Sequence, residues 1–295
     1  MTTIDVENYS LTDRSGKDAW GAGAVTRRTA LATVAVSGAT LTLGHHADAA
    51  APPDKRSRAT APDSAVQAIL DTALTAERLA VTFYYTALTT HAVLRDARLT
   101  GPSVDPFNPG QLPGGNPANV KDLQAALDAE LRHAEALAAA GARSPYTAFY
   151  FPAGTFDGLG EIWRPNTVLG RIDILETAMV GAYASATYQL MLLGRPDLAP
   201  IVARIMGVEA EHRVLGRLIA GADPVRGLAT ELTPIGTVTD AARALRPFVT
   251  GREGEGFSGR PTRPIPLPST ARVARVVGQY RTRVVRGFLQ GGGDV

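Results

Sequence analysis

The feature that most constrains this chain is a set of apolar stripes at helical spacing, each with one glutamate on it or beside it. In the first stripe, Leu70, Leu74, Glu77 and Val81 follow one another at spacings of four, three and four residues. This spacing places them on one face of a helix, which a soluble protein buries against neighbouring helices. We therefore predict a helix over about residues 63–90 with a carboxylate on its buried face.

Similar stripes recur three times further along the chain, with Glu130 on its stripe and Glu176 and Glu209 beside theirs. The predicted helices and their glutamates are about 120–140 with Glu130, about 167–193 with Glu176, and about 199–220 with Glu209. In two of these helices a histidine follows the glutamate by three residues, which gives the pairs Glu130–His133 and Glu209–His212. Three residues are just under one helical turn, so both side chains of a pair leave the helix on the same face.

Four buried glutamates require a compensating positive charge. Burying one ionised carboxylate costs several kcal/mol, and four together also repel one another. The adjacent Arg78, Arg132 and Arg213 do not fit this role, because one position along a helix turns a side chain by about 100°. Two divalent cations would neutralise the four carboxylates, and two neutral imidazoles would complete the ligand set. The sequence therefore predicts that two divalent metal ions are bound by Glu77, Glu130, His133, Glu176, Glu209 and His212.

The connections between the predicted helices indicate how they are arranged. Residues 194–200 form a connection so short that the helices on either side should be antiparallel neighbours. Residues 141–166 are long enough to cross a bundle about 30 Å in length. A glutamate from each of two helices and Glu-x-x-His from each of two others is the ligand pattern of dimetal four-helix bundles. We expect an all-α four-helix bundle with one long crossover connection.

The two halves of the expected bundle repeat a spacing. Glu77 is followed seven residues later by Tyr84, and Glu176 is followed seven residues later by Tyr183. Each of these helices then precedes a Glu-x-x-His helix, so the chain looks like two copies of one helix pair related by a pseudo-twofold axis. We expect both tyrosines in the core, with their hydroxyls bonded to groups that surround the metal ligands. A redox role for the tyrosines is the alternative, and no catalytic residue is assigned.

Two connections have distinctive compositions. Residues 91–119 are rich in proline and glycine and are expected to form a loop, with His91 as a capping or surface residue. Residues 141–166 contain the aromatic side chains Tyr146, Phe149, Tyr150, Phe151, Phe156 and Trp163. We expect these aromatic residues to plug the end of the bundle, with a substrate channel as the alternative.

The N-terminal residues have the features of an export signal. Arg27 and Arg28 precede a moderately apolar run over residues 29–44, and Ala-Asp-Ala at 47–49 offers a small-residue cleavage site. The run is too short to span a bilayer comfortably, because spanning takes about 20 residues. The paired arginines make the segment resemble a twin-arginine export signal.

The expected boundaries follow from this interpretation. We predict a twin-arginine-type signal peptide over 1–49 and a linker over 50–62, although Ala30 stands where such signals commonly have phenylalanine. An ordinary secretory signal or a retained anchor is the alternative. The precursor would use the twin-arginine export machinery, and the mature protein would be periplasmic, associated with the cell wall or secreted.

Residues 222–295 are predicted to form a Pro- and Arg-rich extension. A short helix is expected near 239–246, and the Pro-rich residues 260–268 should be extended. A final helix, about 269–289, has an apolar face, with arginines elsewhere on its surface. Docking of this helix on the bundle is the favoured interpretation, and contact with an anionic membrane or a partner is left open.

Composition excludes several kinds of chemistry. The chain has no cysteine, so disulfides, thiolate metal sites and cysteine nucleophiles are excluded. The net charge of +2 over 295 residues is too mild to indicate a nucleic-acid partner.

Four segments, LTAERLAVTFYYTAL, LDAELRHAEAL, ILETAMVGAYASA and IMGVEAEHRVLGRLIAG, resemble the ferritin-like superfamily of dimetal-carboxylate proteins. They look most like its exported branch, which includes bacterial ferritin-like domain proteins and desiccation-related proteins. The resemblance covers about 63–221 and implies a ferritin-like bundle in which Glu130 and Glu209 bridge two metals. The remaining four predicted ligands would then be terminal. The long loop 91–119 and the C-terminal extension argue against a 24-subunit shell, and a homodimer is one possible assembly.

Carboxylate oxygens with one imidazole per metal suit iron or manganese. We expect an exported oxidoreductase that acts on O₂, H₂O₂ or Fe²⁺, as a ferroxidase or in peroxide detoxification, with manganese-catalase-like dismutation as one variant. The alternative is a stress or desiccation protein in which the metals mainly stabilise the bundle without turnover. A third reading, a degenerate site that serves interaction, is disfavoured by the complete ligand set. Whether the protein is an enzyme is left open, with an oxidoreductase favoured.

Overall fold

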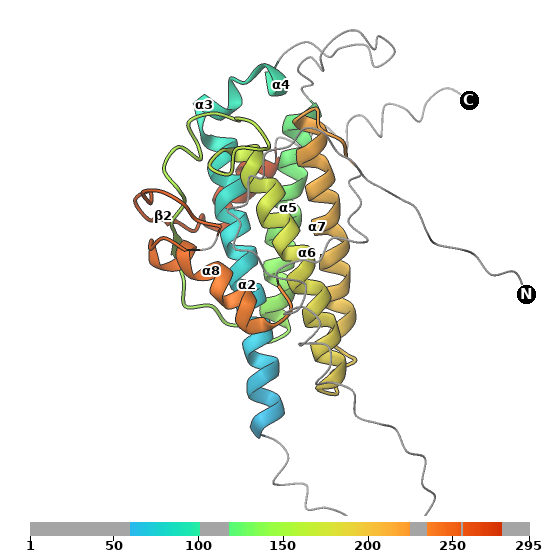
Figure 1. The fold of residues 1–295 in the computed structure, drawn as a ribbon. Coiled ribbons are helices and arrows are strands. Elements are labelled where there is room, and N and C mark those ends of the chain that lie inside the picture. Colours follow the sequence, from blue (N-terminus) through green and yellow to red (C-terminus); the bar gives the residue numbers. More distant parts are fainter. Residues whose placement is uncertain (1–59, 101–117, 225–234, 255, 279–295) are drawn as a thin grey trace, which may run out of the picture. The chain divides into compact units, whose positions relative to one another are not determined.

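The computed structural model describes residues 60–100, 118–224, 235–254 and 256–278. In this part of the chain, four long helices form a bundle (Figure 1). They are α2 (Thr60–Thr89), α5 (Ala118–Ala139), α6 (Val168–Leu192) and α7 (Ala199–Ile219). Each begins and ends within three residues of the corresponding predicted helix. The predicted all-α fold, a four-helix bundle, is confirmed.

The helices pack as two antiparallel pairs joined by a long crossover. α2 packs most closely on α5, and α6 packs most closely on α7, whereas the two pairs contact each other less. Residues 141–166 return along the length of the bundle, so α6 begins at the end of the bundle where α5 began (Figure 1). Gly141, with φ 97°, and Gly221, with φ 67°, follow the last turns of α5 and α7, where a left-handed residue ends a helix.

Within the second pair, α6 and α7 approach very closely. Gly216 on α7 lies against Ile172 on α6, and a Cβ atom at Gly216 would be 2.5 Å from Ile172 Cγ2. The absence of a side chain at Gly216 therefore sets the spacing of this helix pair.

The interior consists of two apolar clusters separated by a polar layer. One cluster contains Phe83, Leu127 and Leu169, and the other contains Leu70 and Leu137. The glutamate-bearing level of each helix lies between them. The apolar core of the bundle is thus interrupted at the level where sequence analysis places the metal ligands.

The aromatic crossover segment packs against the side of the bundle rather than across its end. Phe149 and Phe151 are fully buried, and the Phe151 ring lies 5.9 Å from Phe83 on α2 and 6.2 Å from Phe248. Strand β1 (Ala148–Phe149) pairs antiparallel with β2 (Ile265–Pro266), which ties the crossover to the C-terminal extension. Tyr146 and Trp163 are exposed.

The segment expected to be a loop after α2 contains two short helices, α3 (His91–Leu94) and α4 (Ala97–Thr100). They form because Val93 and Leu99 are buried in the core, which the Pro/Gly content of the segment did not indicate. His91 is exposed at the start of α3, in agreement with the surface role expected for it. Residues 101–117 lie outside the described part of the chain.

The C-terminal extension contains α8 (Val238–Thr250), which is longer than the short helix predicted near 239–246. α8 contacts both α2 and α6. A last helix begins at residue 270 and is described to residue 278. Its Val273 and Val277 are buried in the core, and Gln124 Nε2 of α5 donates a 2.9 Å hydrogen bond to Val276 O. This described portion is docked on the bundle.

Some predictions concern residues that the structure does not describe. The signal peptide predicted over 1–49, most of the linker over 50–62 and the end of the final helix beyond residue 278 lie outside the described residues. Among the described helices, none is both long enough and apolar enough to cross a membrane.

Candidate metal centre

All six predicted ligands meet at one level of the bundle. Glu77 projects from α2, Glu176 from α6, and the Glu-x-x-His pairs project from α5 and α7. The four glutamates are 0–1% exposed, His133 is 9% exposed and His212 is 5% exposed. Helical spacing explains this convergence, because each glutamate occupies a core-facing position of its stripe.

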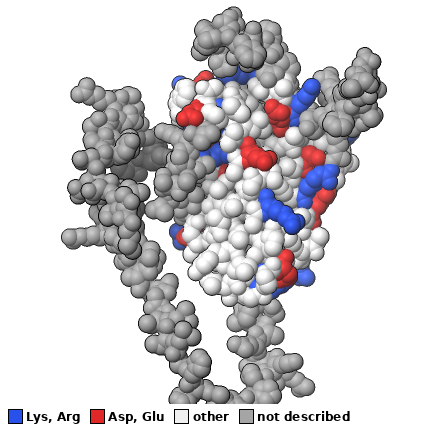
Figure 2. Space-filling model, turned by 90° about the vertical axis from the view of Figure 1, so that its right-hand side faces the viewer, with Lys and Arg blue, Asp and Glu red and all other residues white. Residues whose placement is uncertain are grey.

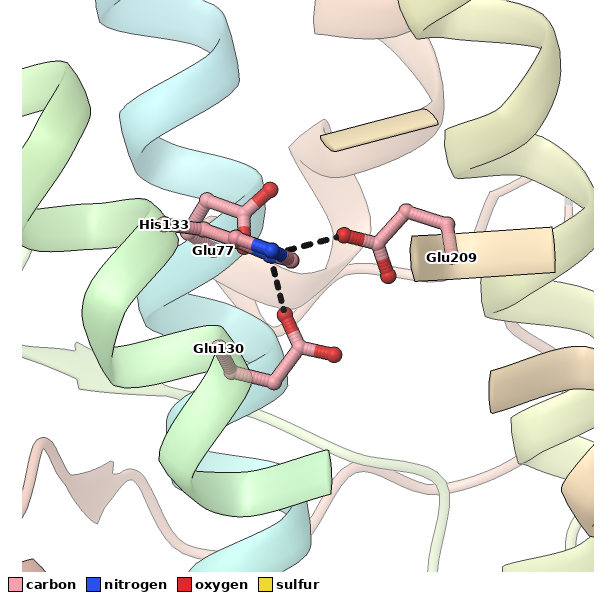
Figure 3. A group of neighbouring side chains, drawn as sticks. All are labelled: Glu77, Glu130, His133 and Glu209. Carbon is pink, nitrogen blue, oxygen red and sulfur yellow. Dashed lines mark ion pairs between the residues drawn. The ribbon is translucent and has the colours of Figure 1, made fainter. Parts of the chain in front are cut away.

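The six residues form two groups that could each hold one metal ion. One group is Glu77, Glu130, His133 and Glu209, and the other is Glu130, Glu176, Glu209 and His212. Within each group, one ligand atom per residue lies within 4.8 Å of all the others. Glu130 and Glu209 belong to both groups, which is the position that bridging carboxylates would occupy. Figure 3 shows the first group, with three carboxylates gathered around the His133 ring.

Each imidazole contacts a glutamate of the other helix pair. His133 Nδ1 on α5 lies 3.0 Å from Glu209 Oε1 on α7, and the ion pair is drawn in Figure 3. His212 Nδ1 on α7 lies 2.8 Å from Glu130 Oε1 on α5. The contacts are related by the pseudo-twofold symmetry that the repeated sequence pattern indicated.

The two tyrosines are also related by this symmetry. Tyr84 on α2 donates a 2.6 Å hydrogen bond to Glu176 Oε1 on α6, and Tyr183 on α6 donates one to Glu77 Oε1 on α2. Both tyrosines are buried. We expected their hydroxyls to bond groups around the ligands, but the hydroxyls bond two of the predicted ligands directly. Each tyrosine therefore orients a carboxylate that the opposite half of the bundle contributes.

Several polar atoms of the cluster have no hydrogen bond of acceptable geometry. Among the described residues these include both carboxylate oxygens of Glu130, one oxygen each of Glu77, Glu176 and Glu209, and His133 Nδ1. A buried polar group without a partner costs about 1–3 kcal/mol, and a charged one costs more. These atoms lie close together but do not hydrogen-bond one another. Ligand atoms that surround a shared cation have this arrangement. The residues present thus fit a pair of divalent metal ions.

In the absence of metal, the cluster retains protons. Burial, reinforced by the charges of Glu209 and Glu130, raises the pKa of Glu77 and of Glu176 well above the usual value. Burial lowers the pKa of His133, but its contacts with Glu130, Glu209 and Glu77 outweigh this effect and raise it to about 12. Burial also lowers the pKa of His212, but the negative charge of Glu130 outweighs burial and raises this pKa to about 11. Bound protons on these glutamates and histidines therefore reduce the negative charge of the cluster, and metal ions would displace them.

The arginines beside the ligands bond elsewhere. Arg78 Nη1 donates a 2.7 Å hydrogen bond to Ser144 O, and Arg132 Nε pairs with Asp128 at 3.2 Å. Arg213 Nε lies 3.5 Å from Asp173 Oδ1. The expectation that these arginines do not neutralise the glutamates is confirmed.

Sequence reasoning missed a groove between α5 and α7. It has a volume of about 680 Å³, and His212 is one of its lining residues. The sequence does contain small residues at this place on α5, including Ala125 and Ala129. Helical periodicity assigns such residues to the packed core, so it does not predict a groove.

Comparison with known sequences identifies one family. The family model described as the ferritin-like domain matches residues 65–222, a little more than half of the chain. The match contains all six predicted ligands, from Glu77 to His212. No curated protein and no solved structure matches the chain significantly.

Proposed function

Because the chain belongs to the ferritin-like domain family, we propose that it is a dinuclear metal protein that reacts with O₂, H₂O₂ or Fe²⁺. The observation that supports this most directly is the layer of four buried glutamates and two histidines between two apolar clusters. Such a layer is unfavourable without cations, because its carboxylates repel one another and several of their oxygens lack hydrogen-bond partners.

The ligand roles follow from the two groups. Glu130 and Glu209 would bridge the metals, because each belongs to both groups. Glu77 and His133 would be terminal ligands of one metal, and Glu176 and His212 would be terminal ligands of the other. This ligand set, mostly carboxylate oxygen with one nitrogen per metal, suits iron or manganese.

When bound, the pair supplies two electrons, one per metal, which with two protons reduce O₂ to H₂O₂ or H₂O₂ to two waters. The chain's own residues prepare the site for this chemistry. The apolar clusters on either side exclude bulk water, and Tyr84 and Tyr183 hold the two terminal carboxylates in place. The imidazoles lie closest to the surface and form the outer edge of the centre.

We further propose that the protein is exported by the twin-arginine route and belongs with the desiccation-related branch of the family. The support is the paired Arg27 and Arg28 before an apolar run, and the likeness of the four helical segments to that branch. Export of an already folded chain would let the metals be loaded before the protein leaves the cytoplasm.

A second function is favoured by the position of the site. The metals would join all four helices at mid-bundle. This second function, called the staple below, is a structural metal site that stabilises the bundle of a stress or desiccation protein. The two functions differ in whether the loaded protein turns over O₂ or peroxide.

The first test is the metal content per chain, measured by elemental mass spectrometry. We expect about two iron or manganese ions per wild-type chain. The double variant Glu130→Ala with Glu209→Ala should bind none, because it removes both shared ligands. The matched control is Glu135→Ala with Glu211→Ala, which removes two exposed glutamates from the same helices and should keep the wild-type content. Equal metal content in the two double variants would refute the site.

The second test separates the redox function from the staple. Anaerobically reduced, metal-loaded protein is mixed with O₂ or H₂O₂, and oxidation of the metals and loss of oxidant are followed together. Repeated consumption of oxidant supports the redox function. A loaded protein that stays reduced in the presence of both oxidants would favour the staple.

A further inference from the structure

The groove between α5 and α7 borders the candidate metal centre at His212. All of its lining residues belong to these two helices. One of them is His212, whose Nδ1 lies 2.8 Å from Glu130 Oε1 inside the cluster. A molecule in the groove would therefore contact the side chain of a proposed metal ligand.

Small side chains keep this groove open. Ala125 and Ala129 line it from α5, and Val208 and Ala210 line it from α7. α5 and α7 also contact each other less than the helices do within each antiparallel pair. Side chains this short cannot fill the space between two helices that are held apart by their own partners.

The opposite side of the bundle, between α2 and α6, is covered. α8 contacts both helices there, and Phe83 and Phe248 both pack against Phe151. The hydroxyls of Tyr84 and Tyr183 bridge α2 and α6 next to the cluster. Within the described residues, access from that side would require packed aromatic side chains to move.

The chemistry of the groove limits what can pass along it. Most of its lining is alanine, valine and leucine, with Asp122 and Glu211 as the acidic members and no lysine or arginine among the described lining residues. An apolar surface does not compensate a charged molecule for lost hydration, and the two carboxylates repel anions. Figure 2 views the molecule from the side on which α7 lies in Figure 1, and shows charged residues scattered among broad uncharged areas.

We propose that the α5–α7 groove is the route by which a small uncharged oxidant, O₂ or H₂O₂, reaches the metal centre, and that it admits anions poorly. The proposal rests on the proposed function, since it requires a loaded centre. It assigns Ala129 and Val208 as the walls that set the width of the route, and Asp122 and Glu211 as the residues that select against negative charge.

The width is tested by filling the groove from either wall. Ala129→Phe and Val208→Phe place a ring in the groove from α5 and from α7, and Ala136→Phe places one on an exposed part of α5 as the matched control. The probe is nitric oxide, an uncharged diatomic molecule. Its binding rate to anaerobic, Fe²⁺-reconstituted protein is followed by absorbance and electron paramagnetic resonance. Metal content is measured on the same samples.

We expect both wall variants to keep wild-type metal content and to bind nitric oxide roughly tenfold more slowly, because binding then requires the new ring to move. Ala136→Phe should bind it at the wild-type rate. If one of the two phenylalanine variants does not fold, the rate is measured on the other. Ala129→Leu is a variant with a smaller added side chain. Wild-type rates in fully loaded wall variants would overturn the route. A wild-type protein that binds no metal would instead overturn the proposed function, and the route with it.

The charge selection is tested with azide as the anionic probe. Asp122→Asn with Glu211→Gln should increase the azide binding rate and leave the nitric oxide rate unchanged, because only the anion is repelled by the carboxylates. The increase should diminish at high salt, where repulsion is screened. An azide rate that does not respond to removal of both carboxylates would overturn the selection.

Discussion

The hydrogen bonds of the two buried tyrosines run between the helix pairs and not within them. Tyr84 supports Glu176, and Tyr183 supports Glu77. In metal sites, partners that orient a ligand contribute to affinity because they hold the ligand in its binding geometry. The tyrosines are therefore the residues beyond the six ligands on which metal binding should depend most directly.

We predict that Tyr84→Phe and Tyr183→Phe each lower metal affinity by roughly 10-fold or more, the range found for groups that orient ligands. Tyr188→Phe is the control, because Tyr188 lies on α6 and is 65% exposed. Competition with a chromophoric chelator measures the affinity. Equal affinities in the three variants would show that the hydroxyls do not orient the ligands.

Residue spacing could predict the six glutamates and histidines, since helix geometry alone decides which positions share a face. It could not predict which tyrosine bonds which glutamate. The seven-residue spacing places Tyr84 on the same face as Glu77, yet its hydroxyl reaches Glu176 across the bundle. That choice depends on the offset between α2 and α6, which only the packed structure defines.

Among the helices, the contact between α6 and α7 depends on Gly216, where a Cβ atom would be 2.5 Å from Ile172 Cγ2. We predict that Gly216→Ala destabilises the protein by about 1–2 kcal/mol, because overpacking outweighs the better helix propensity of alanine. Gly207→Ala on the same helix, where an added Cβ would have no described neighbour within 4 Å, should stabilise it by about 0.5–1 kcal/mol. Urea unfolding of both variants measures the two effects, and shifts in the same direction would contradict this account of the helix contact.

The elements that sequence analysis missed depend on distant contacts. α3 forms where Val93 reaches the core, and β1 pairs with a strand more than a hundred residues away. Local spacing carries no information about such partners. By contrast, each of the four bundle helices is specified by its own stripe, and their bounds were predicted closely for that reason.

For the molecule as a whole, metal loading should couple to stability. A ligand that binds only the folded state at about 100 times its dissociation constant adds roughly 2.7 kcal/mol. For a chain of this size that corresponds to an increase in melting temperature of roughly 5–10 °C. We expect this increase when Fe²⁺ or Mn²⁺ is added anaerobically to chelator-treated protein, measured by circular dichroism, and its reversal by chelator. The Glu130→Ala with Glu209→Ala variant should melt at one temperature with or without metal, and a shift there would place the stabilising metal elsewhere.

The crossed arrangement at mid-bundle has a consequence for how this chain can be divided. Each helical hairpin lacks the imidazole and the tyrosine hydroxyl that contact its own glutamates across the axis, because the other hairpin supplies them. Each half of the bundle therefore holds three of the four residues of one metal group and lacks the shared glutamate that completes it. Two separately expressed hairpins should therefore bind metal only after they associate. Metal binding would then measure the association of the two halves of the polypeptide.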